Sequence, residues 1–491
     1  MKQRRLGIIF MDYVYKEKKM KYLSFILLKR IPSSLVKHLG FSLVKHLPFI
    51  LLSLLSLFPL QQLSAQRLAI VNVQRHGAKG DGVTDDYKAL LSAYNAINKQ
   101  GGGQLYFPKG RYFIKPYHTK DNTVLDLILQ DCKMLEIKGD QAIIEVNGAF
   151  HRSAEYNRGK HYYSKTSSII PMALRNCDSV KISGIEIKGQ VDKMSKDAGL
   201  TESGGHLLTF NHCSRVNVQD VYVHHAQTDG IYINNKSSDF KFNRVRSSNN
   251  ARQGMSIIEL IGGRFENCSF TETGFTGGKY GGHAPQAGVD IEPSTVKHVA
   301  RDISFYKCEF LGNKGSQFVC SKPFTTTNIT LDNCTFAAGK GTYPYQMILT
   351  AKNLVIKNST IDVGKGSIYP VWSRYSGSDV QILNCKISGS GKGIVAVSVD
   401  PANKVLLQGN QLTYTGKTLT SYFPYLQMSK LRFIDNQVTI PAASIREGKI
   451  TSLVQKAEVS SGNVFKSGHQ RMIPKVSYEG SQKVRDQKPR P

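Results

Sequence analysis

The chain has 491 residues, enough for a large buried core, and its apolar content of 40% is ordinary for a globular protein. Its 43 glycines and frequent asparagine-containing turns favour β-structure over a helix bundle. The formal net charge is +29; residues 1–65 hold 11 Lys or Arg and 2 Asp or Glu, which leaves +20 for the remainder. Such a surface suits acidic polysaccharide or an anionic cell surface. Because the positive charge is scattered and no recognition motif occurs, nucleic acid is not an expected partner.

The N-terminal segment has the features of an export signal. Lys37 and Lys45 precede an apolar run over residues 48–60, and residues 63–65 (Leu-Ser-Ala) form a small-residue cleavage site. The run is too short to span a membrane. We therefore expect residues 1–65 to be a leader and the protein to be secreted or periplasmic without a stable membrane anchor. A retained N-terminal anchor is the alternative.

The next elements predict a strand over residues 69–75 and then a helix. The helix is expected to begin near Thr84 or Asp85, either of which is a suitable N-cap, and to end at the glycines of residues 101–103. One helical face is apolar and consists of Tyr87, Leu90, Leu91, Tyr94 and Ile97. We expect this helix to cover the open end of a β-solenoid.

From residue 265 onward one pattern recurs, in which two alternating apolar residues are followed by a small residue and another apolar one. The small residue falls at positions 268, 308, 334, 359, 385, 410 and 436, so that after the first gap the steps are 25 or 26 residues. A regular step with period-two alternation predicts stacked strands, one rung per repeat. The asparagine that often precedes the small residue tolerates the left-handed backbone of a bend.

Four of the eight cysteines occupy the small-residue position of this pattern. Side chains stacked in parallel at strand spacing are poorly aimed for disulfide bonds, so we expect buried free thiols. The repeats predict an all-β solenoid, a single parallel β-helix over residues 66–465 with an N-terminal capping helix. The basic, aperiodic residues 466–491 are expected to form a disordered tail.

The segment from Val71 to Asp86 (VNVQRHGAKGDGVTDD), followed by residues 101–112 (GGGQLYFPKGRY), resembles the opening of the pectate-lyase-like superfamily. This superfamily includes family 28 glycoside hydrolases, alginate C5-epimerases and phage tailspike depolymerases. The resemblance implies a right-handed parallel β-helix. It does not specify the reaction, because the fold hosts lyases, hydrolases, epimerases and adhesins.

Three consecutive rungs align on Gly230, Gly254 and Gly288. The residues two and four positions after each glycine are expected to point outward. Rungs lie about 4.8 Å apart, so Tyr232, Ser256 and Asp290 should form one row on the outer wall. A loop over residues 274–283 is expected to wall one side.

Two carboxylates that face one groove are what glycosidic hydrolysis requires, one protonated and the other ionised. Adjacent carboxylates push their pKa values apart and so supply that difference. We predict Asp290 and Glu292 as catalytic residues, with Asp229 as a third candidate, and Arg252 as a bidentate partner of a substrate carboxylate. The other predicted substrate-binding residues are Tyr232, His225, Ser256 and Gln286.

The leading hypothesis is a secreted enzyme that hydrolyses an acidic, uronate-containing polysaccharide. Residues 228–230 (Thr-Asp-Gly) are similar to the Asn-Thr-Asp of family 28 hydrolases, whose later Asp-Asp, Gly-His-Gly and Arg-Ile-Lys motifs are absent. A lyase or C5-epimerase is the second hypothesis, with Tyr232 or His225 as base and Arg252 as the neutralising group. Residues 288–290 (Gly-Val-Asp) look like an arrangement found in alginate epimerases.

A non-catalytic carbohydrate-binding β-helix is the third hypothesis, in which Asp290 and Glu292 are an ordinary surface pair. No cofactor is expected and no cluster has zinc-like spacing, although calcium held by these two carboxylates and a loop carbonyl is left open. Exposed aromatics such as Tyr343 and Tyr345 either stack on sugar rings or pack loops. The sequence does not indicate the oligomeric state, the sugar or the linkage.

Overall fold

The computed structural model describes residues 69–115, 127–146, 152–158, 161–166, 169–193, 205–339, 343–371, 376–420, 422–445, 452–468, 470–472 and 475–478. The expected leader, residues 1–65, lies outside these residues. None of the helices within them is long and apolar enough to cross a membrane.

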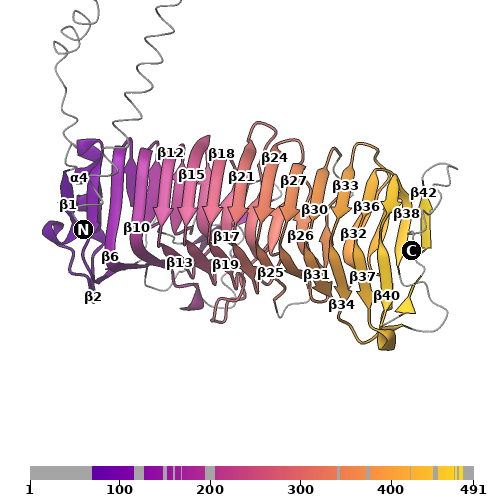
Figure 1. The fold of residues 1–491 in the computed structure, drawn as a ribbon. Coiled ribbons are helices and arrows are strands. Elements are labelled where there is room, and N and C mark those ends of the chain that lie inside the picture. The colour runs from indigo at the N-terminus through magenta and orange to yellow at the C-terminus, as the bar shows by residue number, and fades with distance from the viewer. Residues whose placement is uncertain are drawn as a thin grey trace, which may run out of the picture. The chain divides into compact units, whose positions relative to one another are not determined.

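The strands form two long ladders whose neighbours are parallel, except for one antiparallel pair at the C-terminal end, and they stack as successive coils from the N-terminal to the C-terminal end (Figure 1). The smaller ladder has 13 strands. In spatial order they are β5 (Ile128–Gln130), β9 (Met172–Arg175), β11 (Leu208–Asn211), β14 (Asp229–Asn234), β17 (Gln253–Ile257), β20 (Ala287–Ile291), β23 (Phe318–Cys320), β26 (Tyr345–Leu349), β29 (Ser367–Tyr369), β32 (Gly393–Ser398), β35 (Tyr425–Met428), β38 (Leu453–Ala457) and β42 (Lys475–Tyr478).

The larger ladder has 27 strands in two strips that meet at a bend, and the long strands β6 and β10 run through both strips. The first strip contains β1 (Ile70–Asn72), β3 (Gly103–Phe107), β6 (Lys133–Val146), β10 (Asp178–Lys188), β12 (Ser214–Gln219), β15 (Ser237–Asn243), β18 (Leu260–Glu266), β21 (Ala300–Tyr306), β24 (Thr326–Asp332), β27 (Lys352–Lys357), β30 (Asp379–Leu383), β33 (Lys404–Gln408), β36 (Leu431–Ile434) and β39 (Val459–Ser461). The second adds β2 (Asp81–Asp85), β4 (Arg111–Ile114), β13 (Tyr222–His224), β16 (Arg246–Ser248), β19 (Ser269–Thr271), β22 (Glu309–Leu311), β25 (Thr335–Ala337), β28 (Thr360–Asp362), β31 (Lys386–Gly389), β34 (Gln411–Tyr414), β37 (Gln437–Ile440), β40 (Val464–Ser467) and β41 (Gln470–Arg471).

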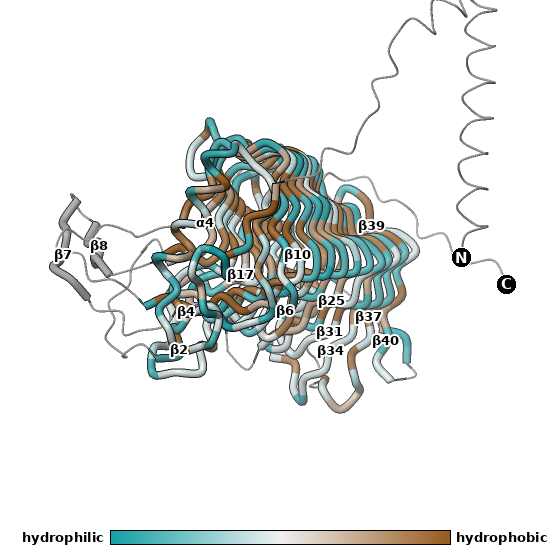
Figure 2. The backbone as a smooth tube through the Cα atoms, turned by 90° about the vertical axis from the view of Figure 1, so that its left-hand side faces the viewer, coloured by the Kyte–Doolittle hydropathy of each residue, from teal (hydrophilic) through white to brown (hydrophobic). Residues whose placement is uncertain are grey.

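One coil runs from β14 through β15 and β16 to β17, which pairs in parallel with β14. Viewed along the stack, the coils superimpose, and apolar residues recur at the same place in each (Figure 2). The predicted all-β parallel β-helix is therefore confirmed. Outside the two ladders lie a hairpin, β7 (Arg152–Arg158) with β8 (His161–Thr166), and the short 3-10 helices η1 (Val73–His76), η2 (Val191–Lys193) and η3 (Ala442–Ser444).

The capping helix α4 (Tyr87–Gln100) lies at the N-terminal end of the stack, as predicted (Figure 1). It ends at Gly101, whose φ of 69° is left-handed. The N-cap prediction was wrong. Asp86 occupies that position, and its carboxylate accepts hydrogen bonds from the backbone N–H groups of Lys79 and Gly80 instead of capping the helix. The strand expected over residues 69–75 ends at Asn72, because the Asn72 side chain caps η1.

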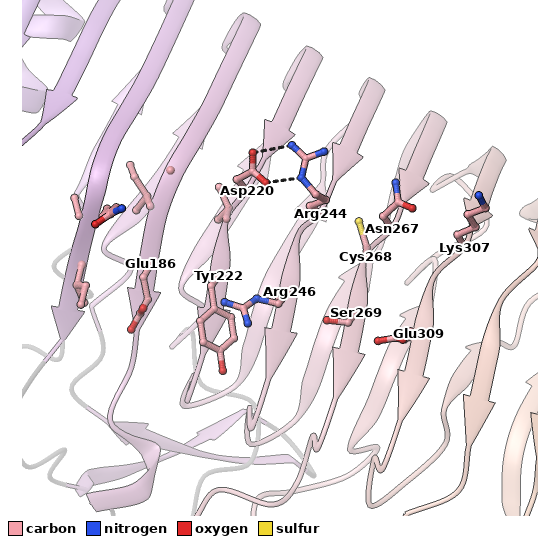
Figure 3. Close-up of a pocket in the computed structure, with 16 residues that line it drawn as sticks. Glu186, Asp220, Tyr222, Arg244, Arg246, Asn267, Cys268, Ser269, Lys307 and Glu309 are labelled. Carbon is pink, nitrogen blue, oxygen red and sulfur yellow. Dashed lines mark hydrogen bonds and ion pairs between the residues drawn. The ribbon is translucent and has the colours of Figure 1, made fainter. Parts of the chain in front are cut away.

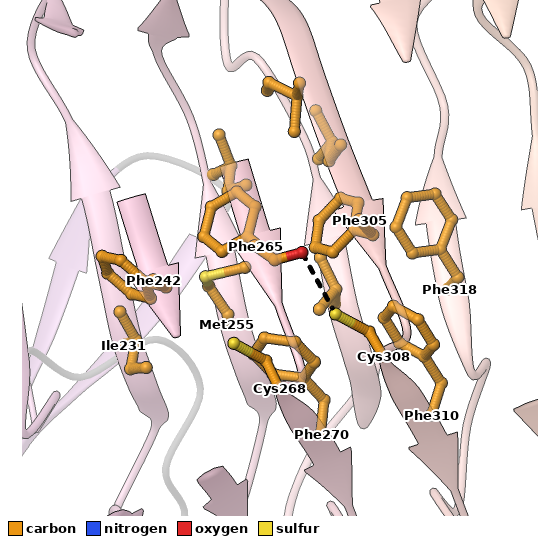
Figure 4. Packing of buried hydrophobic residues seen from close by; sticks show 14 of the residues in the cluster. Ile231, Phe242, Met255, Phe265, Cys268, Phe270, Phe305, Cys308, Phe310 and Phe318 are labelled. Atoms are coloured by element: carbon orange, nitrogen blue, oxygen red, sulfur yellow. Dashed lines mark hydrogen bonds between the residues drawn. The ribbon is translucent and has the colours of Figure 1, made fainter. Parts of the chain in front are cut away.

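The core consists of like residues stacked on like in successive rungs. The rings of Phe265 and Phe305 lie 4.7 Å apart and nearly parallel, and those of Phe310 and Phe336 repeat this arrangement at 4.7 Å. Figure 4 shows the rings of Phe265, Phe305 and Phe310 beside the buried thiols of Cys268 and Cys308. Burying each such ring contributes about 1.5–3 kcal/mol.

The small residue of each repeat forms a buried column, as predicted. All eight cysteines of the chain are buried free thiols. Towards the C-terminal end the column changes to asparagine. The backbone N–H of Asn410 donates to Asn436 Oδ1 at 3.0 Å, and that of Asn436 donates to Asn463 Oδ1 at 2.9 Å. The predicted left-handed bends also occur, with φ between 52° and 56° at Asn267, Asn333, Asn358 and Asn384.

The β-structure continues past residue 465, so the prediction that the disordered tail begins at residue 466 was wrong. β40 extends to Ser467, and β42 pairs in parallel with β38. The free edge of β38 offers unpaired backbone groups to a following segment, and Val476 packs against the core. Residues 479–491 lie outside the described residues.

The aligned glycines Gly254 and Gly288 lie where no side chain fits. A Cβ atom at Gly254 would lie 2.4 Å from the carbonyl oxygen of Gly288 in the next rung. We expect Gly254→Ala to lower the free energy of unfolding by about 1–3 kcal/mol, because the backbones of two rungs would have to separate. Urea denaturation measures this. Gly281→Ala is the control, since its Cβ would meet only the flexible end of Lys314; equal stability of the two variants would contradict the prediction.

Candidate active site

The three predicted segments lie side by side as β14, β17 and β20 of the 13-stranded sheet. Tyr232 pairs with Ser256, and Ser256 pairs with Asp290, so the predicted row exists. The alternate residues Ile231 and Val289 belong to the core, which places the row on the outer face. Alternation along the strand correctly predicts the face on which these residues lie, but it does not predict their burial. Although they are on the outer face, Ser256 is fully buried and Asp290 is 4% exposed.

Arg252 links two of the predicted carboxylates. Its Nη1 donates to Asp229 Oδ2 at 3.0 Å and its Nη2 donates to Glu292 Oε1 at 3.1 Å. The Asp229 side chain is fully buried, whereas 16% of the Arg252 side chain and 24% of the Glu292 side chain remain exposed. Arg252, which the sequence assigned to substrate, thus also orders the acidic groups around it.

Gln253 links the third carboxylate to this cluster, and the sequence interpretation missed it. Its Nε2 donates to Asp290 Oδ2 and to Glu292 Oε1, each at 3.0 Å. The shared donor means that these two carboxylate oxygens lie no more than about 6 Å from each other, so both face the same part of the site. Gln253 is the paired neighbour of Asp229, and its position just before Gly254 was the available signal.

His206 is a second residue that the sequence interpretation missed. Its Nδ1 lies 3.3 Å from Asp229 Oδ2 and 3.1 Å from Thr228 Oγ1, and its ring stacks on Tyr232 with 4.5 Å between centroids. His206 lies two residues before Leu208, which pairs with Ile231, just as Asp229 lies two residues before Ile231. Extending the alignment by one rung towards the N-terminus would have found it.

The pKa of Asp229 is shifted in the opposite direction from the pKa values of Asp290 and Glu292. Burial acts to raise the pKa of Asp229, but Arg252, His206 and Ser256 outweigh it, so the net pKa is lowered and the group is ionised. Burial and the charge of Glu292 raise the pKa of Asp290 well above its usual value. Burial also raises the pKa of Glu292, against the opposing effect of Arg252. The site therefore contains one carboxylate that stays charged and one carboxyl that retains its proton.

The loop over residues 274–283 lies beside the site, as predicted. The N–H of His283 donates to the Ala251 carbonyl, next to Arg252. Burial lowers the pKa of His283 to about 4, which keeps its ring neutral. Gln286 donates from Nε2 to the Gly281 carbonyl at 2.7 Å, so it tethers this loop.

His225 is not brought into the cluster, although only three residues separate it from Asp229. Its Nδ1 contacts Nδ1 of His224 at 2.6 Å, and His224 Nε2 contacts Glu186. The bend before β14 turns the chain, so the two histidines stay with the neighbouring strip that contains β13.

An open recess of about 860 Å³ lies along the bend of the 27-stranded sheet (Figure 3). None of the predicted site residues lines it. Two of its arginines already have partners: Arg244 donates to Asp220 at 2.6 and 2.8 Å, and the Arg246 guanidinium lies 4.3 Å from the centre of the Tyr222 ring. The predicted residues of β14, β17 and β20 thus lie on the outer face of the 13-stranded sheet and not in this recess.

Three polar atoms at the site are buried and have no hydrogen-bond partner among the described residues: Asp229 Oδ1, Gln253 Oε1 and Asp290 Oδ1. Buried polar atoms need partners, so these are positions for water or a substrate hydroxyl. Within the described part of the chain, no three His, Cys, Asp or Glu side chains are placed to hold a metal ion. The calcium site left open by the sequence, two carboxylates with a backbone carbonyl, is a different ligand set and stays a hypothesis.

A family model described as "Rhamnogalacturonase A/epimerase, pectate lyase-like" matches residues 70–274, and one described as "Right handed beta helix region" matches residues 283–438. The protein is a pectate lyase-like right-handed β-helix. The finer link to family 28 hydrolases stays a prediction.

Known relatives of this pectate lyase-like β-helix match it over short stretches. Alginate lyase 7 of Azotobacter vinelandii is 54% identical over 41 residues, 8% of this chain and 5% of that protein. Plasmin and fibronectin-binding protein A of Streptococcus pneumoniae is 34% identical over 84 residues, 16% of this chain and 12% of that protein. The chain thus spans a small part of both. The A-module of mannuronan C-5 epimerase AlgE4 of A. vinelandii superimposes with a TM-score of 0.54 at 16% identity, covering 79% of this chain and all of that one, and shows the shared fold.

Proposed function

We propose that this β-helix is an enzyme that acts on a uronate-containing polysaccharide and removes the proton beside the uronate carboxylate, as a lyase or a C5-epimerase. The observation that carries the proposal is the pair formed by Asp229 and His206. The sequence favoured hydrolysis over proton removal, and this proposal reverses that order, so that hydrolysis becomes the second candidate. Relatives named alginate lyase and mannuronan epimerase support a uronate substrate.

The pair supplies a base. Nδ1 of His206 faces the Asp229 carboxylate, which only accepts hydrogen bonds, and this favours the tautomer with its proton on Nδ1 and leaves Nε2 as the basic nitrogen. No described residue bonds to Nε2, and 15% of the His206 side chain is exposed on the outer face beside Tyr232. The phenol of Tyr232 stays protonated, because burial and the charge of Asp229 raise its pKa to about 12. His206 is therefore the proposed base, in place of Tyr232 or His225.

The same wall supplies groups for the uronate carboxylate. Proton removal beside a carboxylate requires that its charge be offset, by a cation or by a neutral acid that donates a hydrogen bond. Arg252 is the cation, and Asp290, protonated through burial, is the neutral acid. The charge of +20 on residues 66–491 attracts a polyanionic substrate over longer distances.

Hydrolysis is favoured by one specific observation, the opposite pKa shifts of Asp290 and Asp229. In that reaction Asp290 protonates the leaving oxygen, and Asp229 activates water held at the unpartnered acceptors. The structure fits both reactions, and the products distinguish them.

The test is incubation of the purified protein with a panel of alginate, pectate and other acidic polysaccharides. We expect either new ultraviolet absorbance from an unsaturated uronate or, without cleavage, a changed ratio of C5 epimers in the proton NMR spectrum. A Glu309→Gln variant in the separate recess should behave as wild type. Reducing ends without absorbance would replace the proposal by hydrolysis, and no change on any substrate would refute an enzymatic role. The secreted or periplasmic location is part of the proposal and is tested by fractionating cells.

A further inference from the structure

The outer face of the 13-stranded sheet changes from polar to aromatic on the C-terminal side of Asp290. In register with Asp290 stand Val319 of β23, Ile348 of β26 and Tyr369 of β29. The ladder continues through β32, where Val395 pairs with Tyr425. At about 4.8 Å per rung, Tyr369 lies about 14 Å and Tyr425 about 24 Å from the level of Asp290.

The tyrosines on this face contact one another edge to face. The ring centroids of Tyr343 and Tyr345 are 5.6 Å apart and those of Tyr345 and Tyr369 are 5.0 Å apart, with interplanar angles of 86° and 78°. Tyr343 is 37% exposed and the other two rings are partly exposed. Farther along, Lys392 Nζ lies 5.1 Å from the centre of the Tyr425 ring. The exposed parts of these rings lie on the same face of the sheet as Asp290.

The backbone under these rings is held by buried amides. Gln346 donates from Nε2 to the Tyr343 carbonyl at 2.7 Å, and its Oε1 accepts from Gln317 at 3.0 Å. The N–H of Ser367 donates to the Pro344 carbonyl at 2.9 Å. Rings fixed on a rigid strand ladder lose little entropy on binding a ligand, which is typical of a binding surface.

We propose that Tyr343, Tyr345, Tyr369 and Tyr425, here called the tyrosine track, bind further sugar units of the polysaccharide on the C-terminal side of the reacting unit. A sugar ring presents a C–H face that packs on an aromatic face, while phenol hydroxyls bond its edge. Val319 and Ile348 form an apolar floor between the carboxylates and the track. The position of the reacting unit rests on the proposed function; the binding of a polysaccharide chain does not.

Two further observations fit a bound acidic chain. Lys392 beside Tyr425 provides a cation at the far end of the track. The track also begins near the carboxylates: β26, which contains Tyr345, lies two rungs from β20, about 10 Å along the stack. A chain that leaves the reacting site in this direction thus crosses the apolar floor of Val319 and Ile348 and then meets the rings.

The test compares a Tyr345→Ala/Tyr369→Ala double variant with wild type. Tyr306→Ala, which removes a 38% exposed tyrosine from the 27-stranded sheet, is the matched control. Affinity electrophoresis in gels that contain acidic polysaccharide, and kcat/KM on long and short oligosaccharides, are the readouts. We expect about tenfold weaker binding of the polymer and a similar loss in kcat/KM on long chains, with kcat on the shortest substrate unchanged. Tyr369→Leu, which keeps apolar bulk, gives the same comparison if the double variant does not fold.

Equal binding by wild type, the tyrosine variants and the control would overturn the track, as would a wild-type protein that binds no polysaccharide of the panel. A wild type that binds but turns nothing over, with weaker binding in the tyrosine variants alone, would support the track and refute only the proposed reaction.

Discussion

Replacing Asp229 by asparagine is expected to lower turnover by about a thousandfold. Asparagine keeps the shape of the side chain but removes the charge that orients His206 and pairs with Arg252. In the proposed reaction the base loses its tautomer, and in hydrolysis the water-activating group is lost, so the variant tests the site under either mechanism. The measurement is kcat on the polysaccharide that the panel identifies.

Asp229→Asn should also change stability in a defined direction. Because its pKa is lowered on folding, the Asp229 carboxylate stabilises the folded state above its ordinary pKa of about 4 and loses that contribution as the pH falls. We expect the variant to lose about 1–3 kcal/mol near neutral pH. Asp302→Asn, at an exposed position of β21, is the control and should change neither property. Normal turnover in Asp229→Asn would remove this residue from the mechanism.

Asp290→Asn is expected to abolish activity while making the protein more stable near neutral pH. Burial and the charge of Glu292 raise the pKa of Asp290, so the folded state binds a proton that the unfolded state releases above about pH 4. The stability of the wild type therefore falls as the pH rises from about 4 through the raised pKa. Asparagine is neutral throughout and still accepts the hydrogen bond from Gln253.

Urea denaturation at about pH 4 and about pH 8 measures this effect, and the advantage of the variant should grow with pH. Turnover should fall at least about a hundredfold, since the variant cannot donate the proton or neutralise charge as an acid does. A variant whose stability falls relative to wild type as the pH rises would show that Asp290 is ionised in the folded protein, and both mechanisms described here would then lose their acid.

Much of the architecture was predictable because each rung repeats the same burial requirement. The step of 25 or 26 residues placed the strands, the bends at Asn333 and Asn358, and the column that contains Cys308. Alternation around Gly254 and Gly288 placed Tyr232, Ser256 and Asp290 in one row.

The wrong or missing predictions share a physical cause. They concern residues whose contacts depend on the three-dimensional fold and do not follow from the regular spacing of the repeats. His206 was missed because the rung before it is long: the step from Met172 to its partner Leu208 is 36 residues. His225 was predicted at the site because it is near Asp229 in the sequence, but the bend between the two sheets separates the two residues in space. The strands after residue 465 have no period of their own and form on the edge that β38 presents.

The column of small residues has a further consequence in its asparagine section. Thiols such as Cys308 donate hydrogen bonds weakly and tolerate small displacements. The asparagines of the column need a neighbour in register, because the side-chain amide of one coil hydrogen-bonds to the asparagine of the coil before it. This links Asn410, Asn436 and Asn463. A slip by one residue would turn these amides outward and leave buried N–H groups unsatisfied, at a cost of roughly 1–3 kcal/mol each. Within the described residues, an alignment error in these C-terminal coils therefore breaks the amide hydrogen bonds of the column in addition to exposing apolar side chains.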